Sequence, residues 1–153
     1  MGAVVVVDAL WGDSGKGKVA SWLARERGAK ACVRAGLGTN AGHSLMLDDG
    51  RMLRTSQLPL AGVMESCGLW IGSRVGVDPE LLAAELERLS DWKVADRLRI
   101  DSRCPVILPE HKEAERADAF LSGVVGSTLS GTGQCQSRFA LRQCPQARDI
   151  PSL

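Results

Sequence analysis

The feature that most constrains this chain is a glycine-rich turn close to its start, with the sequence Gly12-Asp13-Ser14-Gly15-Lys16-Gly17-Lys18. The turn follows the apolar run of residues 4–7, which predicts a fully buried parallel strand, and it precedes a helical pattern over residues 17–27. In this order of elements, successive backbone N–H groups and a helix N-terminus converge on an anion. The turn therefore predicts a phosphate-binding loop within an α/β fold.

The spacing fits G-x-x-x-x-G-K, but Val19 stands where a Ser or Thr hydroxyl would hold magnesium. Asp13 adds a carboxylate inside the turn, which indicates chemistry as well as binding. The plainer alternative for Asp13 is a helix cap. Lys16 and Lys18 could be solvated, yet lysines at a helix N-terminus oppose the helix dipole unless an anion is present.

The remaining chain alternates strand and helix patterns. Strands are expected at residues 31–34, 69–71, 98–100 and 106–108, and a hairpin at 45–47 and 52–54. Helices are expected from Asp78-Pro79, over 110–121 as a charged and exposed helix, and from 137 to 142. Two further glycine-rich loops span residues 36–43 and 126–133. The alternation predicts an α/β fold in which helices flank a mainly parallel sheet.

Composition narrows the class of protein. The 153 residues suit one domain, and a net charge of +1 implies neither a nucleic-acid nor a membrane partner. No apolar stretch approaches membrane-spanning length. The five cysteines form no C-x-x-C pair, which favours reduced thiols in the cytoplasm over disulfides or zinc.

Three loops together carry a family resemblance. Trp11-Gly12-Asp13-Ser14-Gly15-Lys16-Gly17-Lys18 resembles the W-G-D-E-G-K-G-K signature of adenylosuccinate synthetases, and Gly38-Thr39-Asn40-Ala41-Gly42-His43-Ser44 resembles their N-A-G-H-[TS] loop. Gly126-Ser127-Thr128 and the glycines after it resemble their G-T-T-G-x-G-x-G loop. The likeness is to the shorter, archaeal-like branch and covers nearly the whole chain. It implies a P-loop-NTPase-like sheet, here as the N-terminal part of a single domain that is incomplete at its C-terminus.

The resemblance implies a magnesium-dependent ligase that joins IMP to L-aspartate with GTP, the first committed step from IMP to AMP. In this family the 6-oxygen of IMP is phosphorylated, and the aspartate amine then displaces the phosphate. A cytoplasmic homodimer is also implied. The family's aspartate-binding T-T-G-R-x-R-R motif and its guanine-reading T-K-x-D segment have no match within residues 1–153. The chain by itself is therefore expected to lack ligase activity and to expose apolar sheet surface.

The resemblance also assigns residues. Asp13 matches the general base that deprotonates N1 of IMP and ligates magnesium, and His43 matches the general acid. Lys16 and Lys18 match lysines that contact the transferring phosphoryl group. The expected GTP-binding residues are Gly12, Asp13, Ser14, Gly15, Lys16, Gly17, Lys18, Gly42, His43 and Ser44. The expected IMP-binding residues are Asp13, Ser14, Gly15, Lys16, Asn40, Ala41, Gly42, His43, Thr128 and Arg142.

Several assignments have neighbours or alternatives. Magnesium is expected on Asp13 and the Gly42 carbonyl. Arg142 matches an arginine that reaches across the dimer to IMP, and Arg138 is expected on the same helical face. Ser127 is a neighbour of Thr128 that is also able to bind phosphate, and His111 is expected to be a surface residue without a role in the site.

Ser14 replaces the signature Glu, and Leu129-Ser130 and Gln134-Cys135 depart from the third loop. Some phage-associated relatives act on deoxyguanylate, and a small neutral Ser14 would suit such a (d)GMP substrate, although subfamily drift explains it more simply. Two further alternatives are a plain nucleotide-binding NTPase that shares only the first loop and a truncated fragment that binds nucleotide without catalysis.

Overall fold

The computed structural model describes residues 2–9 and 14–153. Its α-helices are α1 (Lys16–Glu26), α2 (Pro79–Arg88), α3 (Val94–Arg97), α4 (Pro109–Ala117) and α5 (Thr132–Ala140). Its strands are β1 (Ala31–Arg34), β2 (His43–Met46), β3 (Met52–Thr55), β4 (Gly68–Ile71) and β5 (Leu98–Ile100). Shorter helical turns are at Leu60–Val63, Ser90–Trp92, Leu121–Val125 and Ala147–Asp149. The chain is thus a mixed α/β fold, as its sequence predicts.

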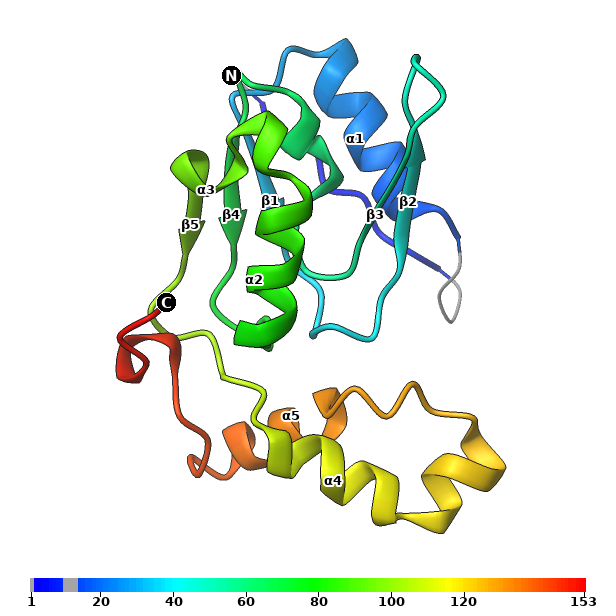
Figure 1. Ribbon diagram of the computed structural model, residues 1–153, viewed down its shortest axis with the longest axis vertical. Coiled ribbons are helices and arrows are strands. Elements are labelled where there is room, and N and C mark those ends of the chain that lie inside the picture. The colour runs from blue at the N-terminus through cyan, green and yellow to red at the C-terminus, as the bar shows by residue number, and fades with distance from the viewer. Residues whose placement is uncertain (1, 10–13) are drawn as a thin grey trace.

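A parallel sheet of order β1-β4-β5 forms the centre, and β2 and β3 pair separately as an antiparallel hairpin. Figure 1 shows α4 and α5 beyond the ends at which β4 and β5 terminate. The loops that leave the carboxyl ends of the strands therefore face α5. This edge of a parallel sheet is where ligands bind in open α/β folds.

Local signals in the sequence account for most of these elements. The Asp78 carboxylate caps α2 by accepting from the Leu81 backbone N–H at 3.2 Å, with Pro79 at the first helical position. Helix α1 ends before Gly28, whose φ of 55° is the left-handed conformation usual after a helix. The predicted helix over 17–27, the strands at 31–34, 69–71 and 98–100, and the hairpin are all confirmed.

The apolar core lies on one face of the parallel sheet. Leu69, Ile71 and Val77 are almost completely buried there, together with Leu58 and Leu89. On the opposite face, Val33 of β1 and Trp70 of β4 are paired in register and are 59% and 47% exposed. Parallel sheets usually have both faces covered, so an exposed apolar face of this kind is unusual.

Two predicted strands are wrong. Residues 4–7 are not in a strand, and Val5 and Val7 are each 80% exposed. An apolar strand is stabilised by neighbours on both edges and both faces, and residues 2–9 have no strand partner among the described residues. Residues 106–108 also form no strand, because Val106 makes one isolated bridge with Val77 before the chain turns into α4.

The helices near the C-terminus also differ from expectation. Helix α4 ends at Ala117, and α5 runs from Thr132 to Ala140 instead of starting at residue 137. Arg142 lies beyond α5 with a φ of 60°, so it does not share a helical face with Arg138. His111 is not a surface residue: it is 1% exposed, and its Nδ1 accepts a hydrogen bond from the Leu108 N–H at 3.0 Å.

Candidate functional site

The glycine turn and the second loop meet where α1 begins beside β2. A Cβ built on Gly17 would lie 2.2 Å from Nδ1 of His43, so only glycine allows the imidazole to sit against the first turn of α1. His43 opens β2 and is half-buried. The structure therefore brings together a predicted phosphate-binding turn and the predicted general acid.

Two cations and burial hold His43 neutral. The Arg34 guanidinium donates a hydrogen bond to His43 Nε2, because a guanidinium has no acceptor. Burial, the largest cause, together with the charges of Arg34 and Lys16, lowers the pKa of His43 to about 4. The imidazole is therefore neutral at pH 7 and able to accept a proton. An anion beside it would act in the opposite direction and raise the pKa.

Lys16, the predicted phosphoryl-binding lysine, is paired within the chain. Its Nζ lies 2.5 Å from Oδ2 of Asp8, whose side chain is 9% exposed while that of Lys16 is 40% exposed. The ammonium keeps part of its surface in solvent at the N-terminus of α1. A phosphate that approaches this turn would therefore meet an ammonium group whose charge is partly offset by the Asp8 carboxylate.

Arg34 joins the second loop to His43. Besides its contact with His43, it donates through Nη2 to the Gly38 carbonyl at 2.9 Å. Its Nε is buried and has no hydrogen-bond partner among residues 2–9 and 14–153, and within these residues it forms no ion pair with a carboxylate. Sequence reasoning missed this residue. Its position as the last residue of a parallel strand, at the ligand-binding edge of the sheet, is the signal that could have found it.

The second and third loops are also in contact. A Cβ on Gly38 would lie 2.7 Å from Cγ2 of Thr132, so the second loop packs directly on the start of α5. A row of hydroxyls links the two loops: Thr128 donates to Ser130 at 3.2 Å, Ser130 pairs with Thr132 at 2.9 Å, and Thr132 lies 3.5 Å from Thr39. The predicted phosphate ligand Thr128 is exposed at the outer end of this row.

The N-terminus of α5 is occupied by a carboxylate of the chain itself. Glu115 is 3% exposed and accepts from the backbone N–H groups of Gly131 and Gly133 at 2.8 Å, and of Gln134 at 3.2 Å. These N–H groups are therefore not open to a phosphate. In the rest of the third loop, the Thr128 hydroxyl donates to Ser130, and the Ser127 hydroxyl accepts from the Leu129 N–H at 3.3 Å.

The other predicted residues are placed as follows. Gly12 and Asp13 lie outside the described residues. Exposed positions are Ser14, Gly15, Lys18, Asn40, Gly42 and Arg142, and partly buried ones are Ala41 and Ser44. Arg142 lines a pocket with Arg74 and Arg148.

Comparisons with known proteins agree with this arrangement. The adenylosuccinate synthetase family model matches residues 5–152. The chain belongs to the adenylosuccinate synthetase family. Adenylosuccinate synthetases of a Pyrococcus species (strain ST700) and of Archaeoglobus fulgidus are 40% and 39% identical over all 153 residues. The chain spans 45% and 44% of these relatives, less than half of their length.

Solved structures of this family share the fold. A fully ligated adenylosuccinate synthetase from Plasmodium falciparum superposes with a TM-score of 0.83 at 23% identity, covering 93% of this chain and 34% of that one. The succinoaminodeoxyadenylate synthetase of cyanophage S-2L, bound to dGMP and to dATP as an energy donor, gives a TM-score of 0.75 at 28% identity. That match covers 95% of this chain and 42% of the phage enzyme.

Magnesium is the ion that the family implies. In phosphoryl-transfer sites this ion is held by one or two carboxylates together with substrate phosphates, and not by a cage of protein ligands. The described residues hold no cluster of three or more His, Cys, Asp or Glu able to bind a metal. The exposed backbone of Gly42, beside His43, offers an oxygen donor of the kind that magnesium prefers, so the donor chemistry fits. The same part of the chain contains no helix that is long and apolar enough to cross a membrane.

Proposed function

We propose that this chain supplies the phosphate-binding part of a GTP-dependent ligase that joins IMP to L-aspartate. The observation that carries the proposal is the cluster of Lys16, Gly17, Arg34 and His43, in which two cations and an imidazole meet at a glycine turn. Such fixed cations stabilise the charge on a phosphoryl group in transfer. We take the substrates of the proposed reaction from the adenylosuccinate synthetase family, to which the chain belongs.

In the proposed reaction, Lys16 and Lys18 bind the phosphoryl oxygens of GTP. Asp13 removes the N1 proton of IMP, which makes the 6-oxygen nucleophilic. The anion that arrives beside His43 raises the pKa of its imidazole, so that His43 gains the proton it donates to the 6-oxygen. Magnesium, held by Asp13 and the Gly42 carbonyl, would supply charge neutralisation on the phosphates.

The remaining IMP contacts follow from the linked loops. Asn40 and Ala41 follow Thr39 in the second loop, and Thr39 is connected through Thr132 and Ser130 to Thr128. One nucleotide can therefore contact the second loop near its base and the third loop with its 5′-phosphate. In the complete homodimer we also expect Arg142 to serve the partner's IMP.

The substrate choice between IMP and a deoxyguanylate rests on Ser14. The curated relatives with the higher identities are adenylosuccinate synthetases, whereas the dGMP-binding phage enzyme is 28% identical. We therefore propose IMP as the substrate and dGMP as the second candidate. Ser14 is exposed at the turn, so a ligand meets it without a rearrangement of the core.

Isothermal titration of the 153-residue chain with GTP, dATP, IMP and dGMP tests this proposal. We expect GTP and IMP to bind, and Lys16→Ala to weaken GTP binding by roughly ten-fold or more, the effect of losing a charge-assisted hydrogen bond. Lys30→Ala is the matched control, since Lys30 is an exposed lysine outside the loops. Equal GTP binding by Lys16→Ala and Lys30→Ala would contradict the proposal, and preference for dGMP and dATP would favour the second candidate.

A further inference from the structure

Two cysteine thiols meet where α5 packs against the segment that follows it. Cys135 lies within α5 and is completely buried, whereas Cys144 follows the helix and is partly exposed. Their sulfur atoms are 3.6 Å apart, and both thiols donate to the Val106 carbonyl, each at 3.5 Å. A disulfide has an S–S distance of about 2.05 Å, so the two sulfurs need to approach by only about 1.5 Å.

The segment that carries Cys144 is held in place by backbone pairing. The Val106 N–H donates to the carbonyl of Pro145, the next residue after Cys144, at 2.9 Å. Pro105 also forms an isolated antiparallel bridge with Gln146. The Cys144 thiol is therefore kept beside Val106, whose carbonyl is also the acceptor for Cys135.

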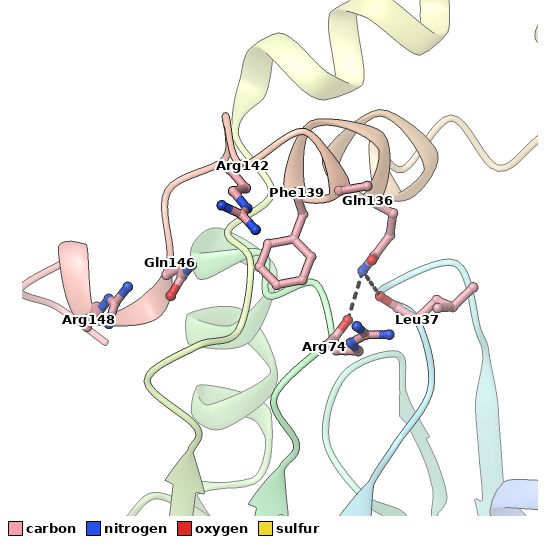
Figure 2. Close-up of a pocket in the computed structure, with 8 residues that line it drawn as sticks. Leu37, Arg74, Gln136, Phe139, Arg142, Gln146 and Arg148 are labelled. Atoms are coloured by element: carbon pink, nitrogen blue, oxygen red, sulfur yellow. Dashed lines mark hydrogen bonds between the residues drawn. The ribbon is translucent and has the colours of Figure 1, made fainter.

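Helix α5 is held on the other side of this contact. Gln136, the residue after Cys135, donates from its side-chain Nε2 to the carbonyls of Leu37 and Arg74, both at 2.8 Å (Figure 2). These bonds tie α5 to the loops that follow β1 and β4. Because both segments are fixed, each thiol is presented to the other as in an intramolecular reaction, which favours closure over reaction with a second chain.

The two thiols differ in how they can react. The thiolate is the nucleophile in thiol chemistry, and exposure decides which thiol an external reagent reaches first. Burial, together with the neighbouring Cys144 thiol, raises the pKa of Cys135, which keeps it protonated and away from solvent. Cys144 is therefore the thiol that meets a reagent, and Cys135 is placed to react second, within the chain.

The other cysteines lack this arrangement. Cys67 and Cys104 are completely buried, and their thiols donate to the backbone carbonyls of Gly68 at 3.5 Å and Gly72 at 3.1 Å. Cys32 is partly exposed, but burial of its thiol raises its pKa to about 11. These three residues serve as internal references for the reactivity of the pair.

From these observations we infer that Cys135 and Cys144 form a modification site, at which a small disulfide such as oxidised glutathione produces a reversible intramolecular disulfide. Cys144 loses its proton to solvent and attacks one sulfur of glutathione disulfide. A Cys144–glutathione bond forms, the original S–S bond breaks, and the departing glutathione thiolate takes up a proton. Cys135 then attacks the Cys144 sulfur and displaces the second glutathione, which leaves with the Cys135 proton.

This exchange removes two electrons and two protons from the chain and reduces one glutathione disulfide to two glutathione molecules. The new bond would close residues 135–144 into a loop that contains Arg142 and would fix this segment against α5. The inference does not rest on the proposed ligase reaction, since neither thiol belongs to the cluster around His43.

Incubation of the 153-residue chain in glutathione buffers with an increasing oxidised share, followed by acid quenching and mass spectrometry, tests the inference. We expect two of the five free thiols to disappear, with a mass lower by two hydrogen atoms and a peptide that links Cys135 to Cys144. Dithiothreitol should restore the original mass. Cys32→Ser is the matched control, because it removes the other partly exposed cysteine and should leave the link intact.

The two single variants should fail in different ways. Cys135→Ala should stop at a stable glutathione adduct on Cys144, whereas Cys144→Ala should leave the buried Cys135 unmodified. The peptide map of the unsubstituted chain gives its answer even if a variant unfolds. A disulfide between two chains, a glutathione adduct on Cys144 that persists while Cys135 is present, or oxidation of Cys32 ahead of the pair would each overturn the inference.

Discussion

At the scale of single residues, the neutral state of His43 depends on its neighbours. Because Arg34 both donates to Nε2 and adds a positive charge, we expect Arg34→Met to raise the pKa of His43 from about 4 toward its ordinary value of 6.5. Burial remains in the variant, so the rise should be partial. An NMR titration of the imidazole signals measures it. Arg54→Met, at an exposed arginine of β3, is the control, and an unchanged pKa in Arg34→Met would contradict this account.

The lowered pKa values of the histidines also make the stability of the fold depend on pH. Burial is the main cause that lowers the pKa of His43 to about 4, and it also lowers the pKa of His111. Below about 6.5 the unfolded chain therefore binds more protons than the folded chain, and for His43 this holds down to about pH 4. Stability rises with pH wherever that is true. The stability that depends on the neutral histidines is therefore complete above pH 6.5 and falls with pH, and the part due to His43 is lost as the pH approaches 4. Urea titrations at several pH values would show this loss.

Gly17 is the second residue on which the cluster depends. We expect Gly17→Ala to destabilise the fold by about 1–3 kcal/mol and to displace His43, since the new Cβ would lie 2.2 Å from Nδ1. Urea unfolding and the chemical shift of the imidazole report the two effects. Gly42→Ala is the control because nothing lies within 4 Å of a Cβ there. A Gly17→Ala chain as stable as Gly42→Ala would show that the close contact is absent in solution.

At the scale of elements, the α4–α5 pair depends on Glu115. Replacing this buried carboxylate by Ala should cost about 2–4 kcal/mol, because the N–H groups of Gly131, Gly133 and Gln134 lose their acceptor. Hydrogen exchange at these three amides should then accelerate. Glu113→Ala, at an exposed position of the same helix, should change neither quantity. Slow exchange that persists in Glu115→Ala would mean that another group caps α5.

The predictability of each element follows from where its stabilising contacts lie. Helix α2 carries its cap and its proline within its own sequence, so it could be predicted from local signals. The start of α5 could not, because its capping carboxylate is Glu115, which lies 16 residues before Gly131. The burial of His111 also arises from this packing, since a Cβ on Gly131 would lie 3.1 Å from the His111 Cβ.

In the candidate site too, some residues could be predicted from sequence motifs and others could not. The motifs identified His43 and the glycine turn from sequence alone, and the structure brings Gly17 and His43 together. Arg34 was not predicted, because it belongs to none of the motifs and its role comes from its contacts with His43 and the Gly38 carbonyl. The prediction of a buried strand at residues 4–7 was wrong, because an apolar run forms such a strand only where neighbouring segments cover it.

At the scale of the whole molecule, uncovered apolar surface dominates behaviour in solution. Val33 and Trp70 on the open face of the sheet, and Val5 and Val7 near the N-terminus, are each at least 47% exposed. We expect the isolated chain to self-associate, since exposed apolar patches and unpaired strand edges promote it. Sedimentation velocity over a range of concentrations measures this. A monodisperse monomer at high concentration would contradict it, and Val33→Ser with Trp70→Ser should reduce the association.

The central claim is that the glycine turn and His43 form one phosphate-responsive site. Its most direct measurement is the pKa of His43 by NMR, in the free chain and with saturating GTP and magnesium. We predict a value near 4 in the free chain and a rise of about one unit or more on binding, because the triphosphate offsets Arg34 and Lys16. A pKa that stays near 4 while GTP is bound would show that the phosphates lie elsewhere and that His43 is not the acid.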